Sequence, residues 1–151
     1  MHLHEYLARD CVAVLEAGSK TEAFEKVIGL LATHPAISDP ALFADAIWQR
    51  EESLSTGIGL GIGAPHVRCK SVRNPAAALA VLRQGIDYGS IDGIPVRVIL
   101  MIAMPEGRHK EYLQYLATAC RLFQKAAFRE RLLACPNADA LWTEIRSGAD
   151  A

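Results

Sequence analysis

AAALAVL at residues 76–82 and VRVILMIAM at residues 96–104 are the two stretches that decide the fold. Both have the length of a strand, and their nearly unbroken apolar character is typical of strands covered on both faces. Turn signals, among them Asp92-Gly93, separate the two stretches. A shorter valine-rich segment, Cys11–Leu15, is soon followed by Gly18 and predicts another strand near the start of the chain.

Two helices are predicted between these strands. Ser19 and Glu22 form the S-x-x-E pattern of a capping box, in which both side chains bind free amides at a helix start. The second helix begins at Asp39, an N-cap residue followed by a proline. Its predicted inward face consists of Leu42, Phe43, Ala46 and Ile47. One more turn places Arg50 on that same face, where a solvated arginine is unexpected.

A third helix is predicted to start after Pro105-Glu106-Gly107, with His109 in its first turn. Its shared face is predicted to consist of Tyr112, Leu113, Leu116, Cys120 and Phe123. Shorter helices are predicted around residues 128–134 and 138–146. Helices alternating with covered strands predict an α/β fold, with a mixed central β-sheet flanked by helices on both sides. At this length we expect a single domain over residues 1–151.

Charge and composition exclude several classes of protein. The sequence has 16 Lys and Arg residues against 17 Asp and Glu residues, so bulk electrostatics favours neither nucleic-acid binding nor a polybasic membrane site. A hydrophobic content of 51% excludes a mainly disordered chain. The longest apolar run, Ile94–Met104, is too short to span a bilayer, and no signal peptide is evident. The sequence therefore predicts a cytoplasmic protein without membrane insertion.

The cysteines and the common catalytic motifs give no sign of a metal or cofactor. No C-x-x-C pair occurs, so the cysteine spacing resembles neither a zinc site nor a redox motif. Reduced thiols, some of them buried, are expected at Cys11, Cys69, Cys120 and Cys135. No G-x-S-x-G, H-E-x-x-H or paired-carboxylate motif supports a hydrolase. We expect neither a metal nor a cofactor.

The densest signal lies in residues 50–66, REESLSTGIGLGIGAPH. A dinucleotide-binding loop needs a strand before its glycines and a helix after them. Here a helix precedes the glycines and Pro65 disfavours helical backbone at Ala64, so a nucleotide-binding loop is excluded. Two interpretations remain from the residues alone. The segment is either a glycine-rich bend into a strand, with His66 simply packed nearby, or a loop that presents His66 at a concave surface.

Residues 50–66 resemble the phosphorylation-site signature of enzyme IIA domains of the bacterial phosphotransferase system. The branch they resemble is the mannitol/fructose type, which includes the nitrogen-regulatory IIA proteins. The likeness continues at Ile91-Asp-Gly-Ile-Pro-Val96, at Met104-Pro105 and at His109 with Leu113, Leu116 and Ala117. It therefore covers most of the chain in the expected order, and predicts one IIA type-2 domain over residues 1–151.

The resemblance implies a function for three residues. In that family a histidine accepts a phosphoryl group from the phosphocarrier protein HPr and passes it to a IIB domain, and His66 matches this histidine. Arg50 and His109 match an arginine and a second histidine that support the site. This sequence departs from the common A-I-P-H-G pattern at Ala64 and Val67, which puts the shape of the acceptor loop and the choice of partner in doubt.

These residue types suit phosphoryl transfer. Neutral imidazole is nucleophilic near pH 7, and the guanidinium fork of Arg50 matches phosphate oxygens. His109 at a helix start is interpreted equally well as a phosphate contact or as a simple helix cap. A solvated basic rim is the expectation for Arg68, Lys70, Arg73, Arg108 and Lys110. For Glu51 and Glu52 there are two interpretations, orienting Arg50 or simple exposure at the helix end, and exposure is the expectation.

Three functions remain open at this point. The leading one is a phosphoryl carrier in sugar uptake, a phosphotransferase component with a phosphohistidine intermediate. The alternative is a regulatory protein whose phosphorylation state controls binding to other proteins. Residues 55–59, STGIG, and the absence of fused IIB or IIC segments favour this alternative. A degenerate member that has lost transfer is the third, and it is disfavoured because Arg50, His66 and His109 are all present.

Overall fold

The two stretches that decide the fold form the centre of the sheet. β5 spans Ala76–Ile86 and β6 spans Val96–Met104, and they run antiparallel, with Ala76 opposite Ala103. Alternate side chains of β5 and β6 pack into two separate hydrophobic cores, one on each face of the sheet, because successive residues of a strand point to opposite faces. The computed structural model describes residues 1–53 and 55–148. The predicted domain of residues 1–151 therefore includes residues 54 and 149–151, which lie outside the described residues.

The sheet is mixed, as predicted. Its path through the described residues runs β1-β5-β6-β3-β2, and β4 also pairs with β6. β1 (Leu7–Leu15) is parallel to β5, and β3 (Ile62–Gly63) is parallel to β6. β2 (Gly57–Gly59) forms an antiparallel pair with β3. β4 (His66–Arg68) is parallel to the C-terminal end of β6.

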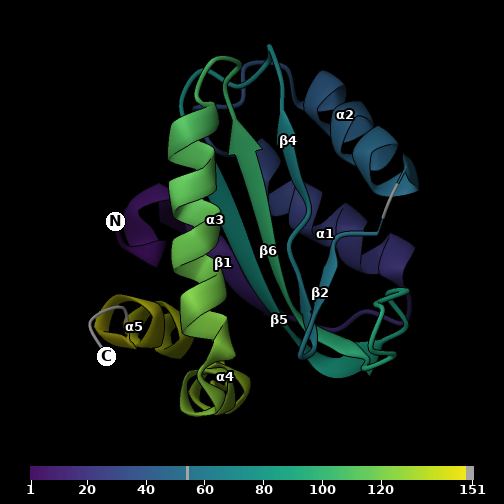
Figure 1. The fold of residues 1–151 in the computed structure, drawn as a ribbon, viewed down its shortest axis with the longest axis vertical. Coiled ribbons are helices and arrows are strands. Elements are labelled where there is room, and N and C mark those ends of the chain that lie inside the picture. Colours follow the sequence, from purple (N-terminus) through teal and green to yellow (C-terminus); the bar gives the residue numbers. More distant parts are fainter. Residues whose placement is uncertain (54, 149–151) are drawn as a thin grey trace.

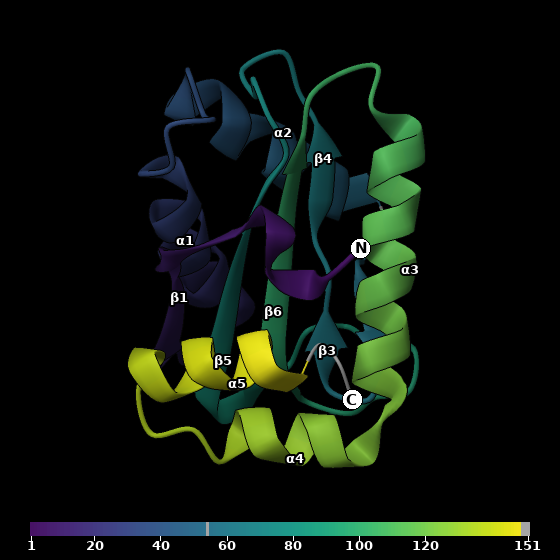
Figure 2. The same cartoon turned by 90° about the vertical axis from the view of Figure 1, so that its left-hand side faces the viewer.

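Helices cover both faces of the sheet, which confirms the predicted α/β class (Figures 1 and 2). One face carries α1 (Lys20–Ala32) and α2 (Pro40–Ser53). The other face carries α3 (His109–Gln124), α4 (Ala126–Leu133), α5 (Ala138–Gly148) and the 3-10 helix η1 (Leu3–Tyr6). Among the described residues, no helix is both long enough and apolar enough to cross a bilayer.

Side-chain caps fix the helix starts that the sequence predicts. The Ser19 hydroxyl accepts a hydrogen bond from the Glu22 amide at 3.1 Å, while the Glu22 carboxylate accepts from the Gly18 amide at 3.1 Å. The Asp39 carboxylate accepts from the Leu42 amide at 3.1 Å. Each cap satisfies an amide that the helix itself leaves without a partner.

The predicted inward faces of two helices are partly wrong. In α2, Phe43 and Ile47 are fully buried, but Leu42 is 46% exposed. In α3, Leu113 is 49% exposed, and the fully buried residue is Tyr115. Adjacent residues of a helix point about 100° apart, so burying Phe43 and Tyr112 turns Leu42 and Leu113 toward solvent. Both apolar stripes are therefore narrower than the sequence pattern suggests.

Candidate functional site

The site is built around a break in the strand that lies along one edge of β6. β3 and β4 both pair with β6, and Ala64 and Pro65 separate them. The Ala64 amide donates to the Thr56 carbonyl at 3.0 Å, and the Pro65 carbonyl accepts from the Ile102 amide at 2.9 Å. Because proline has no N–H to give to the sheet, pairing resumes at His66, the first residue of β4.

His66 is half-buried, and one of its ring nitrogens is held by the backbone. Its Nδ1 lies 2.9 Å from the Ala64 carbonyl oxygen. A carbonyl oxygen only accepts, so Nδ1 carries the proton and the neutral ring has its lone pair on Nε2. Burial lowers the pKa of His66 below its ordinary value, although the bond to Ala64 opposes this. The ring is therefore neutral near pH 7, with Nε2 as its basic atom.

Two arginines place positive charge near His66. Arg50 lies in the last turn of α2, which is beside β4 (Figure 1), and it is half-buried as the inward helix face predicts. Arg68 is two residues along β4 and so lies on the same face of the strand as His66. After burial, the charges of both arginines further lower the pKa of His66. Cations near a half-buried imidazole favour its neutral form and attract an anion.

Tyr112 of α3 connects His66 with His109. Its ring centroid lies 5.0 Å from that of His66 and 6.2 Å from that of His109. Burial raises the pKa of the Tyr112 hydroxyl, and the charges of Arg50 and Arg68 partly offset this rise. The structure thus brings together residues from the end of α2, from β4 and from the start of α3.

His109 is exposed at the first position of α3, where the sequence places it. Its Nδ1 lies 3.3 Å from a guanidinium nitrogen of Arg68. Arginine is always protonated and donates, so Nδ1 of a neutral His109 accepts and its Nε2 carries the proton. The two histidines therefore adopt opposite tautomers: Nε2 has the lone pair in His66 and the proton in His109.

Three residues near the site were not assigned to it by the sequence. Tyr112 was predicted to lie on the apolar helix face and Arg68 in a solvated rim. For Arg68, the spacing of two residues from His66 was a usable signal, because such residues lie on the same face of a strand. The prediction that Glu51 is exposed is wrong, because Glu51 is only 7% exposed. Lys20 of α1 forms an ion pair with it, and this long-range contact cannot be read from local sequence. Glu52, by contrast, is exposed as expected.

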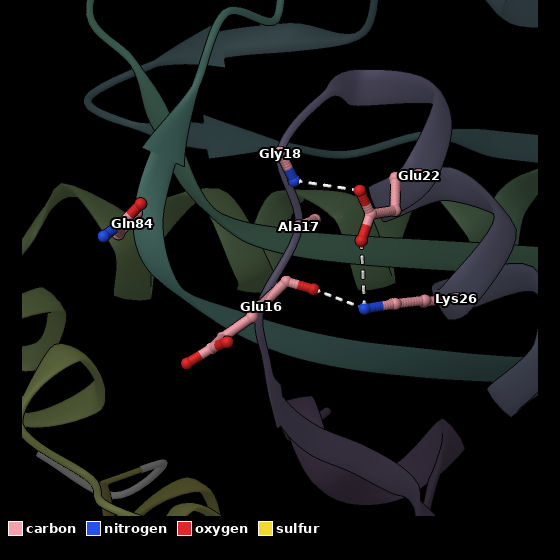
Figure 3. Close-up of a pocket in the computed structure, with 6 residues that line it drawn as sticks. All are labelled: Glu16, Ala17, Gly18, Glu22, Lys26 and Gln84. Carbon is pink, nitrogen blue, oxygen red and sulfur yellow. Dashed lines mark hydrogen bonds and ion pairs between the residues drawn. The ribbon is translucent and has the colours of Figure 1, made fainter.

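A pocket of about 350 Å³ lies at the other edge of the sheet, where β1 leads into α1 (Figure 3). It is lined by Glu16, Ala17, Gly18, Glu22, Lys26 and Gln84. The lining groups bind one another, since Lys26 donates to the Glu16 carbonyl at 2.6 Å and pairs with Glu22 at 3.2 Å. Within residues 1–53 and 55–148, no group of three or more His, Cys, Asp or Glu side chains is arranged to hold a metal ion.

Comparisons with known proteins show which proteins this chain is similar to. The chain is 32% identical over 142 residues to the PTS system fructose-specific EIIABC component of Bacillus subtilis (strain 168). The matched region covers 93% of this chain but only 22% of that protein. It is 31% identical over 125 residues to a nitrogen regulatory protein of Pseudomonas aeruginosa, covering 83% of this chain and 81% of that protein.

A solved structure supports the same assignment. The crystal structure of nitrogen regulatory protein IIA-Ntr from Neisseria meningitidis superposes with a TM-score of 0.85 at 28% identity, covering 95% of this chain and 98% of that chain. Residues 5–148 match the family model described as "Phosphoenolpyruvate-dependent sugar phosphotransferase system, EIIA 2". The chain therefore belongs to the EIIA 2 family of the phosphoenolpyruvate-dependent sugar phosphotransferase system.

Proposed function

We propose that this chain is a phosphoryl carrier in which His66 accepts a phosphoryl group from phospho-HPr and passes it to a IIB domain. The observation that carries this proposal is the bond from Nδ1 of His66 to the Ala64 carbonyl, which leaves the lone pair on Nε2. A neutral imidazole held in one tautomer is a nucleophile that needs no prior proton transfer. The exchange with HPr would take place in the cytoplasm.

The transfer would be a displacement at phosphorus. The Nε2 lone pair of His66 forms the new N–P bond while the bond between phosphorus and the donor atom breaks, and the electron pair of the broken bond returns to the donor. The Nδ1 proton stays on His66. Its bond to Ala64 strengthens as the phosphorylated ring gains positive character. Transfer to IIB reverses these changes and restores the neutral ring.

The neighbouring residues would stabilise the transferring group. Arg50 supplies a guanidinium fork for the phosphoryl oxygens, whose negative charge must be compensated during transfer. The Nε2–H of His109 is a second donor, held in this tautomer by Arg68. In this proposal Arg50 and His109 contact the phosphoryl group and Arg68 positions His109.

The test is enzymatic phosphorylation with purified components. Wild-type protein incubated with phosphoenolpyruvate, enzyme I and HPr should gain the mass of one phosphoryl group, and the product should be acid-labile. The His66→Gln variant should gain none, whereas His2→Gln, a variant of an exposed histidine away from the site, should be labelled like the wild type. Stable labelling of a folded His66→Gln variant would exclude His66 as the acceptor.

A regulatory function is the second candidate, supported by two of the similar proteins. One of the similar proteins, at 31% identity, is the nitrogen regulatory protein of Pseudomonas aeruginosa. The other is the Neisseria nitrogen regulatory protein IIA-Ntr, whose structure superposes with a TM-score of 0.85 at 28% identity. In this case His66 is still phosphorylated, but the result of phosphorylation is a change in binding to a target protein.

A transfer assay separates the two candidates. Phosphorylated protein is isolated from HPr and mixed with a purified IIB domain, for example the IIB portion of a fructose-specific system. Rapid loss of the phosphoryl group to IIB supports the carrier. Retention of the group by a protein that HPr labels efficiently, together with state-dependent binding to a purified target, supports regulation.

A further inference from the structure

A buried carboxylate lies next to the site, at the end of α2. Glu51 follows Arg50 directly, and its side chain is 4% exposed. It forms an ion pair with Lys20 of α1. It also accepts three hydrogen bonds from Thr56: from the amide at 3.1 and 3.3 Å and from the hydroxyl at 2.6 Å. Glu51 therefore binds both the amide and the hydroxyl of Thr56.

Tyr88, just after β5, fixes the same threonine from the other side. Its hydroxyl lies 2.8 Å from the Thr56 hydroxyl, and Tyr88 is only 2% exposed. Lys20 connects the two partners, since its ammonium group donates to the Tyr88 carbonyl at 3.0 Å and lies 4.2 Å from the centre of the Tyr88 ring. Glu51 and Tyr88 thus both bind Thr56, and Lys20 of α1 binds both of them.

Thr56 is connected to His66 through the backbone. Its carbonyl accepts a hydrogen bond from the Ala64 amide at 3.0 Å. The carbonyl of the same Ala64 accepts the bond from Nδ1 of His66 at 2.9 Å. A continuous path of hydrogen bonds therefore runs from the buried carboxylate of Glu51, through Thr56 and Ala64, to the ring nitrogen that sets the His66 tautomer.

We propose that Glu51 and Thr56 are positioning residues, which fix the Ala64 carbonyl and so hold His66 in the tautomer with its lone pair on Nε2. The proposal rests on the proposed function of His66 as phosphoryl acceptor. Buried ion pairs contribute little net stability compared with apolar packing, so fixing a geometry is the more direct explanation for this one. Residues that hold a reacting group in its geometry affect the rate of the reaction rather than the binding of the partner.

The charges around His66 are consistent with this assignment. Arg50 and Arg68 lower the pKa of His66, while the carboxylate of Glu51 raises it. The ring of Tyr112, which carries no charge, also packs against the His66 ring. Replacing Glu51 with glutamine removes one negative charge and loosens Thr56, and both changes lower the pKa of His66. Replacing Thr56 with valine leaves every charge in place and removes only the hydroxyl bonds.

The experiment compares Glu51→Gln, Thr56→Val and Thr56→Ser with Glu52→Gln, the exposed neighbour on the same helix. The first readout is the His66 tautomer, from ¹⁵N NMR of the imidazole ring in the unphosphorylated protein. Wild type, Thr56→Ser and Glu52→Gln should show a single Nδ1–H tautomer. Glu51→Gln and Thr56→Val should show a mixture of tautomers. The second readout is the rate of phosphorylation by phospho-HPr, expected to fall about 10- to 100-fold in those two variants.

The two readouts separate this proposal from the proposed function. If HPr fails to label the wild type, the proposed function fails, while the tautomer measurement still tests the positioning role. If Glu51→Gln does not fold, the pair Thr56→Val and Thr56→Ser decides the matter. A folded Thr56→Val variant with an unchanged tautomer and an unchanged rate would overturn the positioning role. A mixture of tautomers and a reduced rate with valine, but with serine neither, would support it, because a mere loss of stability in a folded variant does not change the tautomer of His66.

Discussion

Gly63→Ala is expected to destabilise the protein through one close contact. A Cβ at residue 63 would lie 2.6 Å from Cζ and 2.8 Å from Oη of Tyr88, distances at which the ring must shift. The ring has little freedom to do so, because Tyr88 is 2% exposed, its hydroxyl bonds to Thr56 and its ring centroid lies 5.8 Å from that of the tilted Phe24 ring. Gly63 itself lies in β3, so alanine introduces steric overlap rather than backbone strain.

The size of the effect follows from the cost of adding a methyl group to a filled core, about 1–3 kcal/mol. For a chain of this length, that corresponds to a fall in the melting temperature of roughly 2–12 °C. Urea unfolding followed by far-UV circular dichroism measures the change. The control is Gly29→Ala in α1, where nothing lies within 4 Å of the added Cβ and a gain of about 0.5–1 kcal/mol is expected. A Gly63→Ala variant as stable as the wild type would refute the packing of Tyr88 against β3.

Four further predictions concern the site and the core. Because burial lowers the pKa of His66 below 6.5, the rate of phosphorylation should rise with pH through a midpoint below 6.5 and level off at higher pH; Arg50→Gln removes a positive charge and should move this midpoint upward. Arg50→Gln should also lower the maximal rate about 100- to 1000-fold, as expected when a charge-stabilising donor is lost. The rate is measured by quenching the labelling reaction with phospho-HPr after defined times. Arg68→Gln should give a mixture of His109 tautomers in ¹⁵N NMR spectra while His66 keeps its single tautomer. Phe24→Ala, at a position with no exposed surface, should cost about 3–5 kcal/mol in urea unfolding, and a loss below 1 kcal/mol would contradict its place in the core.

The two central strands were predicted well because their apolar character identifies them. β1, by contrast, begins at Leu7 rather than at the predicted Cys11, and no bounds were predicted for the short strands β2, β3 and β4. Residues 96–104 form β6 with the predicted bounds, since a strand buried on both faces must be apolar throughout. β5 begins at Ala76 as predicted but continues beyond residue 82 to Ile86, because the exposed residues 83–85 interrupt the apolar pattern before the buried Ile86. A strand that extends beyond the core keeps its backbone pairing without an apolar pattern to indicate it.

The polar interior of the protein was the part that the sequence did not predict. Glu51 has the local setting of an exposed residue at a helix end, and only the arrival of Lys20 and Thr56 makes its burial possible. The Nδ1 bond of His66 depends on the backbone turn at Ala64 and Pro65, which residue types alone do not specify. Contacts between elements set these groups, whereas periodicity reports one element at a time.

The most direct test of the account is the position of the phosphoryl group on the His66 ring. Protein with ¹⁵N-labelled histidine is phosphorylated by phospho-HPr, and ³¹P and ¹⁵N NMR identify the nitrogen that is bound to phosphorus. The hydrogen bond from Nδ1 to Ala64 predicts phosphorylation at Nε2 of His66, with the Nδ1 proton retained. Phosphorylation at Nδ1, or at any other residue, would contradict it.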